Sequence, residues 1–277
     1  MRKLCSSIVA IATLSQIASA SAGNLHVRAV AELGFLSVLD HKVQFSKSGT
    51  YFDYNEDGGQ DVLFAFSRLS LELGLNSRNS FILLYQPLSI QTQESLGKPL
   101  SVDSLLFPAG TNVKFLYDFP FYRVSYLREF LSENELFSLA AGLSLQIRNA
   151  TISFESLDGS RYRTTRDVGP VPALKLRTSW HPDDLFWVTL EADGIYAPVS
   201  YLNGSDEEIV GSILDASLRS GIDMTSSSKA FVNIRYLGGG AVGTDSDDEG
   251  PGDGYVKNWL HFLTVSAGLI YEFAAVD

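Results

Sequence analysis

The segment ELFSLAAGLSLQIR, residues 135–148, decides the fold. From position 137 onward its odd-numbered positions are apolar, whereas the even-numbered positions are small or polar. This alternation with a period of two residues continues to position 148 and predicts a β-strand with one apolar face. Strands of soluble domains usually have about five or six residues. A strand of about twice that length is typical of a β-barrel that crosses a membrane.

The same alternation recurs along the chain, and no segment shows a helical period. We expect ten strands, at about 25–45, 61–75, 80–93, 111–130, 135–154, 165–180, 184–197, 211–223, 229–240 and 257–273. Short turns near 76–79, 131–134, 181–184 and 225–228 alternate with longer polar loops near 46–60, 94–110, 157–164, 198–210 and 241–256. An even number of long strands with loops of alternating length predicts an all-β fold, a transmembrane antiparallel up-and-down β-barrel.

Two details bear on this fold. Aromatic residues stand towards the ends of the apolar faces, as the interfacial girdles of a membrane barrel require; they are Trp180, Tyr196, Tyr236, Trp259, Tyr271 and Phe273. The polar parity changes across Phe119-Pro120, which predicts a bulge. A soluble β-sandwich or lipocalin-like barrel would also alternate, but six to eight shorter strands would suffice for it.

The N-terminus MRKLCSSIVAIATLSQIASASAG resembles a secretory signal peptide. Two basic residues precede a mostly apolar run at 8–18, and Ala20-Ser21-Ala22 fits a cleavage site. The run is too short to span a bilayer as a helix; the alternatives are a buried helix or a membrane anchor. We expect a signal peptide at 1–22 and one barrel domain at 23–277. Cys5, the only cysteine, then leaves with the signal, and no disulfide can form.

The charge of the chain argues against nucleic acid as a partner. Without Arg2 and Lys3 the 21 basic residues fall to 19, against 32 acidic residues, which leaves a net charge of −13. The export signal and the strand pattern together predict the bacterial outer membrane. The expected partners are outer-membrane lipids, lipopolysaccharide and the barrel-assembly machinery.

If the apolar face meets lipid, the polar face lines the lumen. The expected lumen-lining residues are Arg28, Glu32, Arg68, Glu72, Arg123, Arg148, Lys175, Arg177, Glu191, Asp193, Asp215, Arg219, Arg235 and Glu272. A ten-stranded barrel is only slightly wider than an eight-stranded one, whose interior side chains can fill. Unpaired charges would be costly in that space, so we expect paired and hydrogen-bonded networks in a largely filled lumen.

Residues with catalytic potential are few. His41, beside Asp40, lies near the outer end of the first strand, and His261 lies in the last strand, which adjoins the first when the barrel closes. A carboxylate can orient a histidine base, so these three residues are the candidate catalytic group. The chain has no G-x-S-x-G, H-E-x-x-H or glycine-rich phosphate loop.

The stretch FDYNEDGGQD, residues 52–61, spaces its oxygen-bearing side chains like a calcium loop. The candidate ligands are Asp53, Asn55, Asp57 and Asp61. An EF-hand needs a glutamate at its twelfth position, and that position is Phe64. A shorter calcium loop and an ordinary Asp-Gly-Gly turn between two strands therefore stay as alternatives.

The mature chain resembles the small outer-membrane β-barrel proteins of Gram-negative bacteria, many of which have no assigned function. The resemblance rests on the signal peptide, on ELFSLAAGLSLQIR and on GGQDVLF, LLYQPL, FPFYRVSYL and NWLHFLTVSAGLIYEF. The residues AAVD after Phe273 depart from the common aromatic C-terminus. Omptin-like proteases are similar in strand number, but no D-x-H or D-x-D pair stands at matching rim positions.

The resemblance is architectural and transfers no catalytic residue. It implies a structural or interaction role at the cell envelope for a barrel with a filled polar lumen. The alternatives are a narrow porin-like channel for small polar solutes and an outer-membrane enzyme that hydrolyses lipid or peptide.

Overall fold

The computed structural model describes residues 25–76, 78–134, 136–198, 209–244 and 252–273. The expected signal peptide, the residues after Phe273, and parts of the expected loops at 198–210 and 241–256 lie outside the described residues. Among the residues that the structure describes, no helix is long and apolar enough to cross a membrane.

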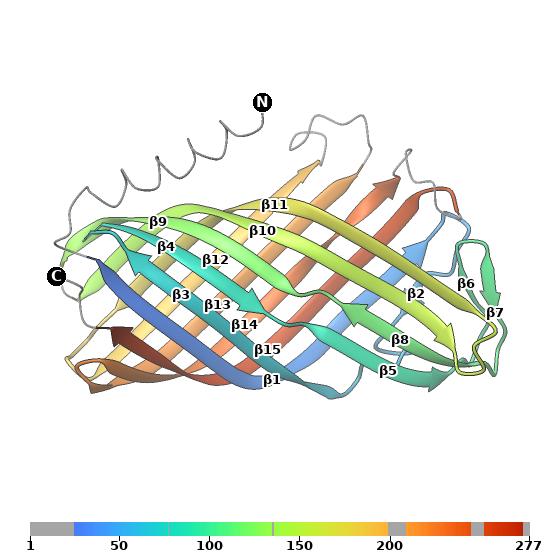
Figure 1. Cartoon of the computed structure of the whole chain (residues 1–277), viewed down its shortest axis with the longest axis horizontal. Helices are drawn as coiled ribbons and strands as arrows, with labels where there is room; N and C mark the ends of the chain where they lie inside the picture. The colour runs from blue at the N-terminus through green and yellow to red at the C-terminus, as the bar shows by residue number, and fades with distance from the viewer. Residues whose placement is uncertain (1–24, 77, 135, 199–208, 245–251, 274–277) are drawn as a thin grey trace, which may run out of the picture.

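The chain forms a closed antiparallel β-barrel of ten wall strands (Figure 1). The strands are β1 (His26–Phe45), β2 (Phe52–Asp53), β3 (Leu63–Gly74), β4 (Asn79–Gln86), β5 (Ser89–Ser95), β6 (Leu100–Val102), β7 (Leu105–Phe107), β8 (Asn112–Asp118), β9 (Phe121–Asn134), β10 (Phe137–Ser156), β11 (Tyr162–Trp180), β12 (Phe186–Pro198), β13 (Val210–Thr225), β14 (Ser228–Thr244) and β15 (Tyr255–Phe273). Neighbours in sequence pair around the wall, and β1 pairs with β15 to close it. This confirms the predicted fold class.

Two wall strands are broken by prolines. β4 and β5 follow one another along a single path and are interrupted at Pro87, and β8 and β9 are interrupted at Phe119-Pro120. Proline cannot donate to the ladder, so the regular strand pairing is interrupted at both places, where the N–H of Phe119 still donates to the carbonyl of Leu88 at 2.7 Å. The register is the same on both sides of the break, with Gln86 opposite Phe121 and Ser89 opposite Asp118. The strand is therefore interrupted at Phe119-Pro120, but the predicted bulge is wrong.

The broken strands leave a split in the wall beside β3. β3 pairs with β4 only from Leu69 to Gly74, and β5 pairs with β8. Among the described residues, no strand partner faces Leu63 to Arg68 on that side of β3. The opposite edge of β3 stays paired with β1 along its whole length. We call this break between the first half of β3 and β5 the wall split.

The hydrophobic pattern reverses halfway along the barrel. In β10, Leu145 is exposed outward and Gln146 is buried inward, but eight residues later Phe154 is buried inward and Glu155 is half exposed. We call the half that holds β4 and β9 the membrane tier and the half that holds β5 and β8 the outer tier. The membrane tier has an apolar exterior and a polar interior, and the outer tier has the opposite arrangement.

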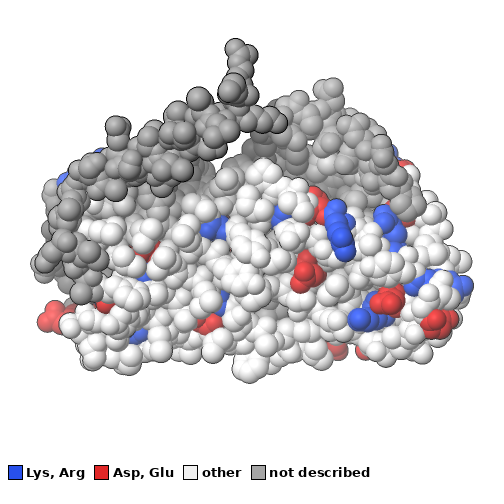
Figure 2. All heavy atoms as spheres, viewed as in Figure 1, with Lys and Arg blue, Asp and Glu red and all other residues white. Residues whose placement is uncertain are grey.

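The exteriors of the two tiers differ accordingly. Large apolar side chains with about half or more of their surface exposed cover the membrane tier; they include Leu33, Phe35, Leu69, Val124, Leu143, Leu174, Leu190, Val232, Val265 and Leu269. In Figure 2 this part of the surface is mostly white, and charged side chains gather at the right, where Figure 1 shows β5 to β8. An apolar belt of this kind is what a bilayer requires of a barrel exterior.

The membrane tier ends in short turns. The connections at Gly74–Asn79, Asn134–Phe137, Trp180–Phe186 and Thr225–Ser228 all lie at the end where β1 begins and β15 finishes. In bacterial outer-membrane barrels the short turns face the periplasm. The outer tier, with the β6–β7 hairpin, therefore projects to the cell exterior.

Candidate functional site

A network of ion pairs crosses the lumen of the membrane tier. At its centre Asp215 on β13 accepts two hydrogen bonds from Arg235 on β14, at 2.5 Å from Nε and 2.8 Å from Nη2. Nη1 of Arg123, from β9 across the barrel, lies 2.8 Å from Asp215 and 2.9 Å from Asp193. All four side chains are buried. Arg123 also donates to Gln146 at 2.7 Å, so opposite walls of the barrel are joined.

The network continues towards the periplasmic end. Lys175 on β11 bridges Asp193 at 2.8 Å and Glu191 at 2.7 Å. Arg177, two residues further along the same face, donates to Glu191 at 2.9 Å and to Glu72 at 2.8 Å. Because Glu72 lies on β3, this chain of charges again spans the lumen. Two residues of separation on a strand place both cations on one face.

A third cluster surrounds Glu32 on β1. Its carboxylate accepts hydrogen bonds from Arg219 at 2.8 Å, from Asn233 at 2.8 Å and from Ser266 at 3.1 Å. Arg68, directly opposite Glu32 in the β1–β3 ladder, is 3.6 Å from it. Glu32 is almost completely buried, so these partners offset the cost of taking its charge out of water.

Below these clusters lies a polar cavity of about 230 Å³, which we call the vestibule. Its wall includes Arg68, Arg219 and Glu191 from the network, and Trp187 and His181 towards the short turns. The ion network closes its inner end.

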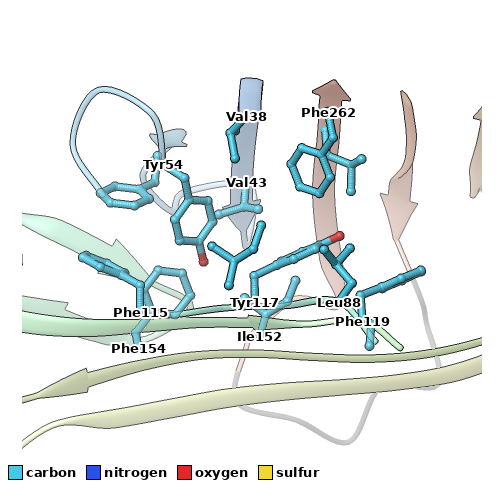
Figure 3. Close-up of a cluster of buried hydrophobic side chains, with 14 of the residues drawn as sticks. Val38, Val43, Tyr54, Leu88, Phe115, Tyr117, Phe119, Ile152, Phe154 and Phe262 are labelled. Atoms are coloured by element: carbon cyan, nitrogen blue, oxygen red, sulfur yellow. The ribbon is translucent and has the colours of Figure 1, made fainter. Parts of the chain in front are cut away.

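The outer tier is filled by apolar side chains, many of them aromatic. The aromatic members of this apolar cluster are Phe45, Phe52, Tyr54, Phe66, Phe107, Phe115, Tyr117, Phe119, Phe121, Phe154 and Phe262. Phe115 stacks on Phe52 with ring centres 5.1 Å apart and meets Tyr54 and Phe154 edge-on at 5.8 Å. Figure 3 shows Tyr54 pointing at Phe115 and Phe154, with Phe262 on the other side. The expected polar lumen therefore holds for the membrane tier only; the interior of the outer tier is apolar.

The calcium-like stretch folds into a turn that covers part of the wall split. Asp53 Oδ1 accepts the backbone N–H groups of Asn55 and Glu56, and Asp53 Oδ2 lies 3.3 Å from Nζ of Lys42. The carbonyl of Gly58 accepts a hydrogen bond from Thr92 on β5 at 2.5 Å. The turn therefore connects β1 to β5 where β3 and β5 do not pair.

Two side chains of this turn point inward. Tyr54 and Gln60 are completely buried, and burial raises the pKa of the Tyr54 hydroxyl well above its usual value. Within the described part of the chain, no three His, Cys, Asp or Glu side chains lie close enough to hold a metal ion. Calcium binding by Asp53, Asn55, Asp57 and Asp61 stays a prediction of the sequence.

The three candidate catalytic residues do not form one site. Asp40 and His261 face each other across the β1–β15 ladder, but His41 pairs with Leu260 and projects to the opposite face. A β-bulge between Val38 and Asp40 changes the parity of β1 and turns His41 into the lumen.

The environments of the two histidines differ as well. His41 is buried, stacked on Tyr54 at 4.5 Å, with Nδ1 2.8 Å from Oε1 of Gln60. His261 lies on the outer face, where Nδ1 is 2.5 Å from the hydroxyl of Tyr236. Asp40 bonds to Lys42 at 2.6 Å. No carboxylate orients either histidine by a hydrogen bond within the described residues.

Two of the expected lumen residues lie apart from the ion network. Arg148 stands where the tiers meet and pairs with Asp167. Glu272 lies near the periplasmic rim, partly exposed and 3.8 Å from Lys229. The structure adds Gln146, Asn233 and other uncharged polar residues to the network. These residues share the inward parity of the charged positions, which is the signal that could have identified them.

No protein-family model matches the chain, and no curated protein matches its sequence. Solved structures do match. The outer membrane protease OmpT from Escherichia coli superposes with a TM-score of 0.50 and 15% identity over 91% of this chain and 100% of that one. A Pseudomonas aeruginosa FadL homologue gives 0.39 and 9% over 90% of both chains. Outer membrane protein OprG from P. aeruginosa gives 0.34 and 10% over 92% and 99%.

The superposition on OmpT shows a shared fold. The chain therefore has the fold of the small β-barrels of the Gram-negative outer membrane, and the apolar exterior of its membrane tier fits a bilayer.

Proposed function

We propose that this outer-membrane β-barrel is a sealed protein with a structural or interaction role at the cell envelope. The observation that carries the proposal is that two different fillings occupy successive levels of the lumen. The ion network crosses the membrane tier, and the apolar cluster fills the outer tier. A hydrated ion would have to disrupt both.

A sealed lumen is favoured over a channel because of the free energy that an ion would need to pass through it. Moving through the network would separate buried charges such as Asp215 and Arg235, and breaking a buried pair costs about 3–5 kcal/mol. The apolar cluster offers few polar groups to replace the hydration shell of an ion; those in it or against it include the hydroxyls of Tyr54 and Tyr117 and the side chains of His41 and Gln60. The separation of His41 from His261 removes the group that favoured an enzyme.

Conductance across a planar bilayer tests the seal. The purified protein should show no discrete openings in potassium chloride, with an open porin as the positive control for insertion. Discrete, reproducible openings from the wild-type protein would contradict the proposal and favour the channel.

Variants can show whether the two seals act independently. Asp215→Ala weakens the network and Phe115→Ala weakens the apolar cluster, so each single variant should stay silent because the other seal remains. Openings that need both substitutions together would establish two seals in series. Openings from Asp215→Ala alone would show that the outer tier does not seal.

Outer-membrane lipids and lipopolysaccharide are the partners we propose for the exterior. The apolar belt of the membrane tier and the charged surface of the outer tier support this assignment (Figure 2). Lipopolysaccharide that copurifies in fixed ratio with the barrel in mild detergent is the expected result.

A further inference from the structure

The vestibule presents more cationic than anionic side chains. It is lined by Arg28, Arg68, Arg177, Arg219 and Lys229 and by Glu72, Glu129 and Glu191. Other carboxylates that pair with these cations, among them Glu32 and Asp223, do not line it. Among the side chains that line the space, cations therefore outnumber carboxylates, while Glu32, Asp223 and Glu272 pair with those cations from behind the wall.

Several of these cations also have N–H groups without an acceptor. Among the described residues, Nε and Nη1 of Arg68 and Nε of Arg219 are buried without a hydrogen-bond partner, and the same holds for Nε of Arg28. Nη1 of Arg68 lies 3.6 Å from Glu32, an ion-pair distance that is too long for a hydrogen bond. Arg68 and Arg219 are themselves more than nine-tenths buried. Buried polar groups are nearly always paired, because an unmade hydrogen bond costs the desolvation of the group.

The carboxylates of the vestibule do not meet this demand. Glu72 accepts from Arg28 at 2.5 Å and from Arg177 at 2.8 Å, and Glu191 accepts from Lys175 and Arg177. These two carboxylates are already held by other donors. The third, Glu129, has a buried Oε1 without a donor among the described residues, so it does not accept from the arginines either. Water could accept from the free N–H groups, but water carries no charge to offset the cationic wall.

We propose that the vestibule binds a small tetrahedral oxyanion of the phosphate class, entering from the periplasm. Guanidinium groups match the oxygen edges of such anions and bind them by charge-assisted hydrogen bonds. Four oxygens can accept from Arg68 and Arg219, which both lie beside Glu32, whereas a carboxylate offers two. The cavity volume of about 230 Å³ admits an ion of this size with some water.

Trp187 supplies a local reporter for the test. Its indole lines the vestibule and is buried. Fluorescence of the full mature protein in detergent is followed while sodium phosphate replaces sodium chloride at constant ionic strength. Sodium sulfate and sodium acetate are titrated in parallel. We expect a saturable change with phosphate and sulfate and at least about tenfold weaker binding of acetate.

The variant Arg68→Gln should weaken phosphate binding by about tenfold or more, since a charge-assisted hydrogen bond is lost. Arg78→Gln is the matched control, because Arg78 is exposed in a turn at the same end and does not line the vestibule. If Arg68→Gln does not fold, Arg28→Gln, at the mouth of the vestibule, is tested instead and should also weaken phosphate binding.

Three results would overturn the proposal. They are a linear response shared by phosphate and chloride, equal binding of acetate and phosphate, and unchanged binding in the Arg68 or Arg28 variant. None of these results depends on conductance, so the proposed sealing of the lumen is tested independently of anion binding.

Discussion

Replacing Phe115 with alanine tests whether the outer tier has a true apolar core. The ring is completely buried and makes one stacked and two edge-on contacts, with centre distances of 5.1, 5.8 and 5.8 Å. Truncation of a buried phenylalanine costs about 3–5 kcal/mol. Lost aromatic pairs add to the burial of area, so we expect about 4 kcal/mol in the free energy of unfolding.

Urea unfolding in phospholipid vesicles, followed by tryptophan fluorescence, measures this loss. The matched control is Lys114→Ala, one residue away on β8 and on the opposite face. Lys114 is partly exposed and lies 4.0 Å from Glu155, so its loss should cost less than about 1 kcal/mol. Equal losses in the two variants would refute an apolar interior, because they would place both side chains in similar surroundings.

Three further predictions follow from the ion network, the wall split and the β10–β11 turn. Asp215→Ala should lower the free energy of unfolding by about 3–5 kcal/mol, because it leaves the buried Arg235 without its carboxylate and Arg123 with Asp193 alone. Asp223→Ala, whose partner Lys229 lies near the rim, should cost less than about 1 kcal/mol in the same assay; equal costs would contradict the network. Thr92→Val removes the hydrogen bond to Gly58 and should speed proteolysis within residues 54–61 without loss of the folded barrel; an unchanged cleavage rate would contradict that role. Hydrogen bonds from the Ser156 hydroxyl, and then from Ser160, lower the pKa of Asp158 to about 2. The order of this turn should therefore persist above about pH 4 and be lost as pH falls through about 2; an NMR titration midpoint near 4 would contradict it.

The strands were predictable because each carries its own signal. The expected ten segments agree with the observed wall strands to within a few residues at most ends, and the observed strands run further into the loops at 157–164 and 241–256. Alternation identifies a strand locally, without knowledge of its partners. An irregularity at Phe119-Pro120 was predictable for the same reason, because proline cannot donate to a ladder. Its form was not, since the strand is interrupted there without the expected bulge.

The apolar interior of the outer tier was missed because alternation identifies two faces but not the solvent beside each one. In β10 the apolar positions change from odd at Leu143 and Leu145 to even at Ile152 and Phe154, and this change was legible in the sequence. It could have been read as a strand that leaves the bilayer.

The surroundings of His41 and His261 could not be predicted, because they depend on contacts between residues that are distant in sequence. The bulge between Val38 and Asp40 turns His41 inward, and nothing near it in sequence marks that bulge. The wall split likewise depends on which strand segments meet, and pairing between strands distant in sequence is not encoded locally. The vestibule is lined by residues from several strands, so it forms only when the barrel closes and could not be predicted from any one segment.

The wall split also sets a limit on how deep the barrel can sit. Hydrocarbon cannot hydrogen-bond to exposed backbone groups, so an open sheet edge is not tolerated within the bilayer core. The last paired residues beside the split are Leu69 on β3 and Tyr85 on β4. The unpaired edge of Leu63 to Arg68 must therefore lie above the hydrocarbon boundary or beneath the 52–61 turn, so the extent of that turn limits how deep this side of the barrel can sit.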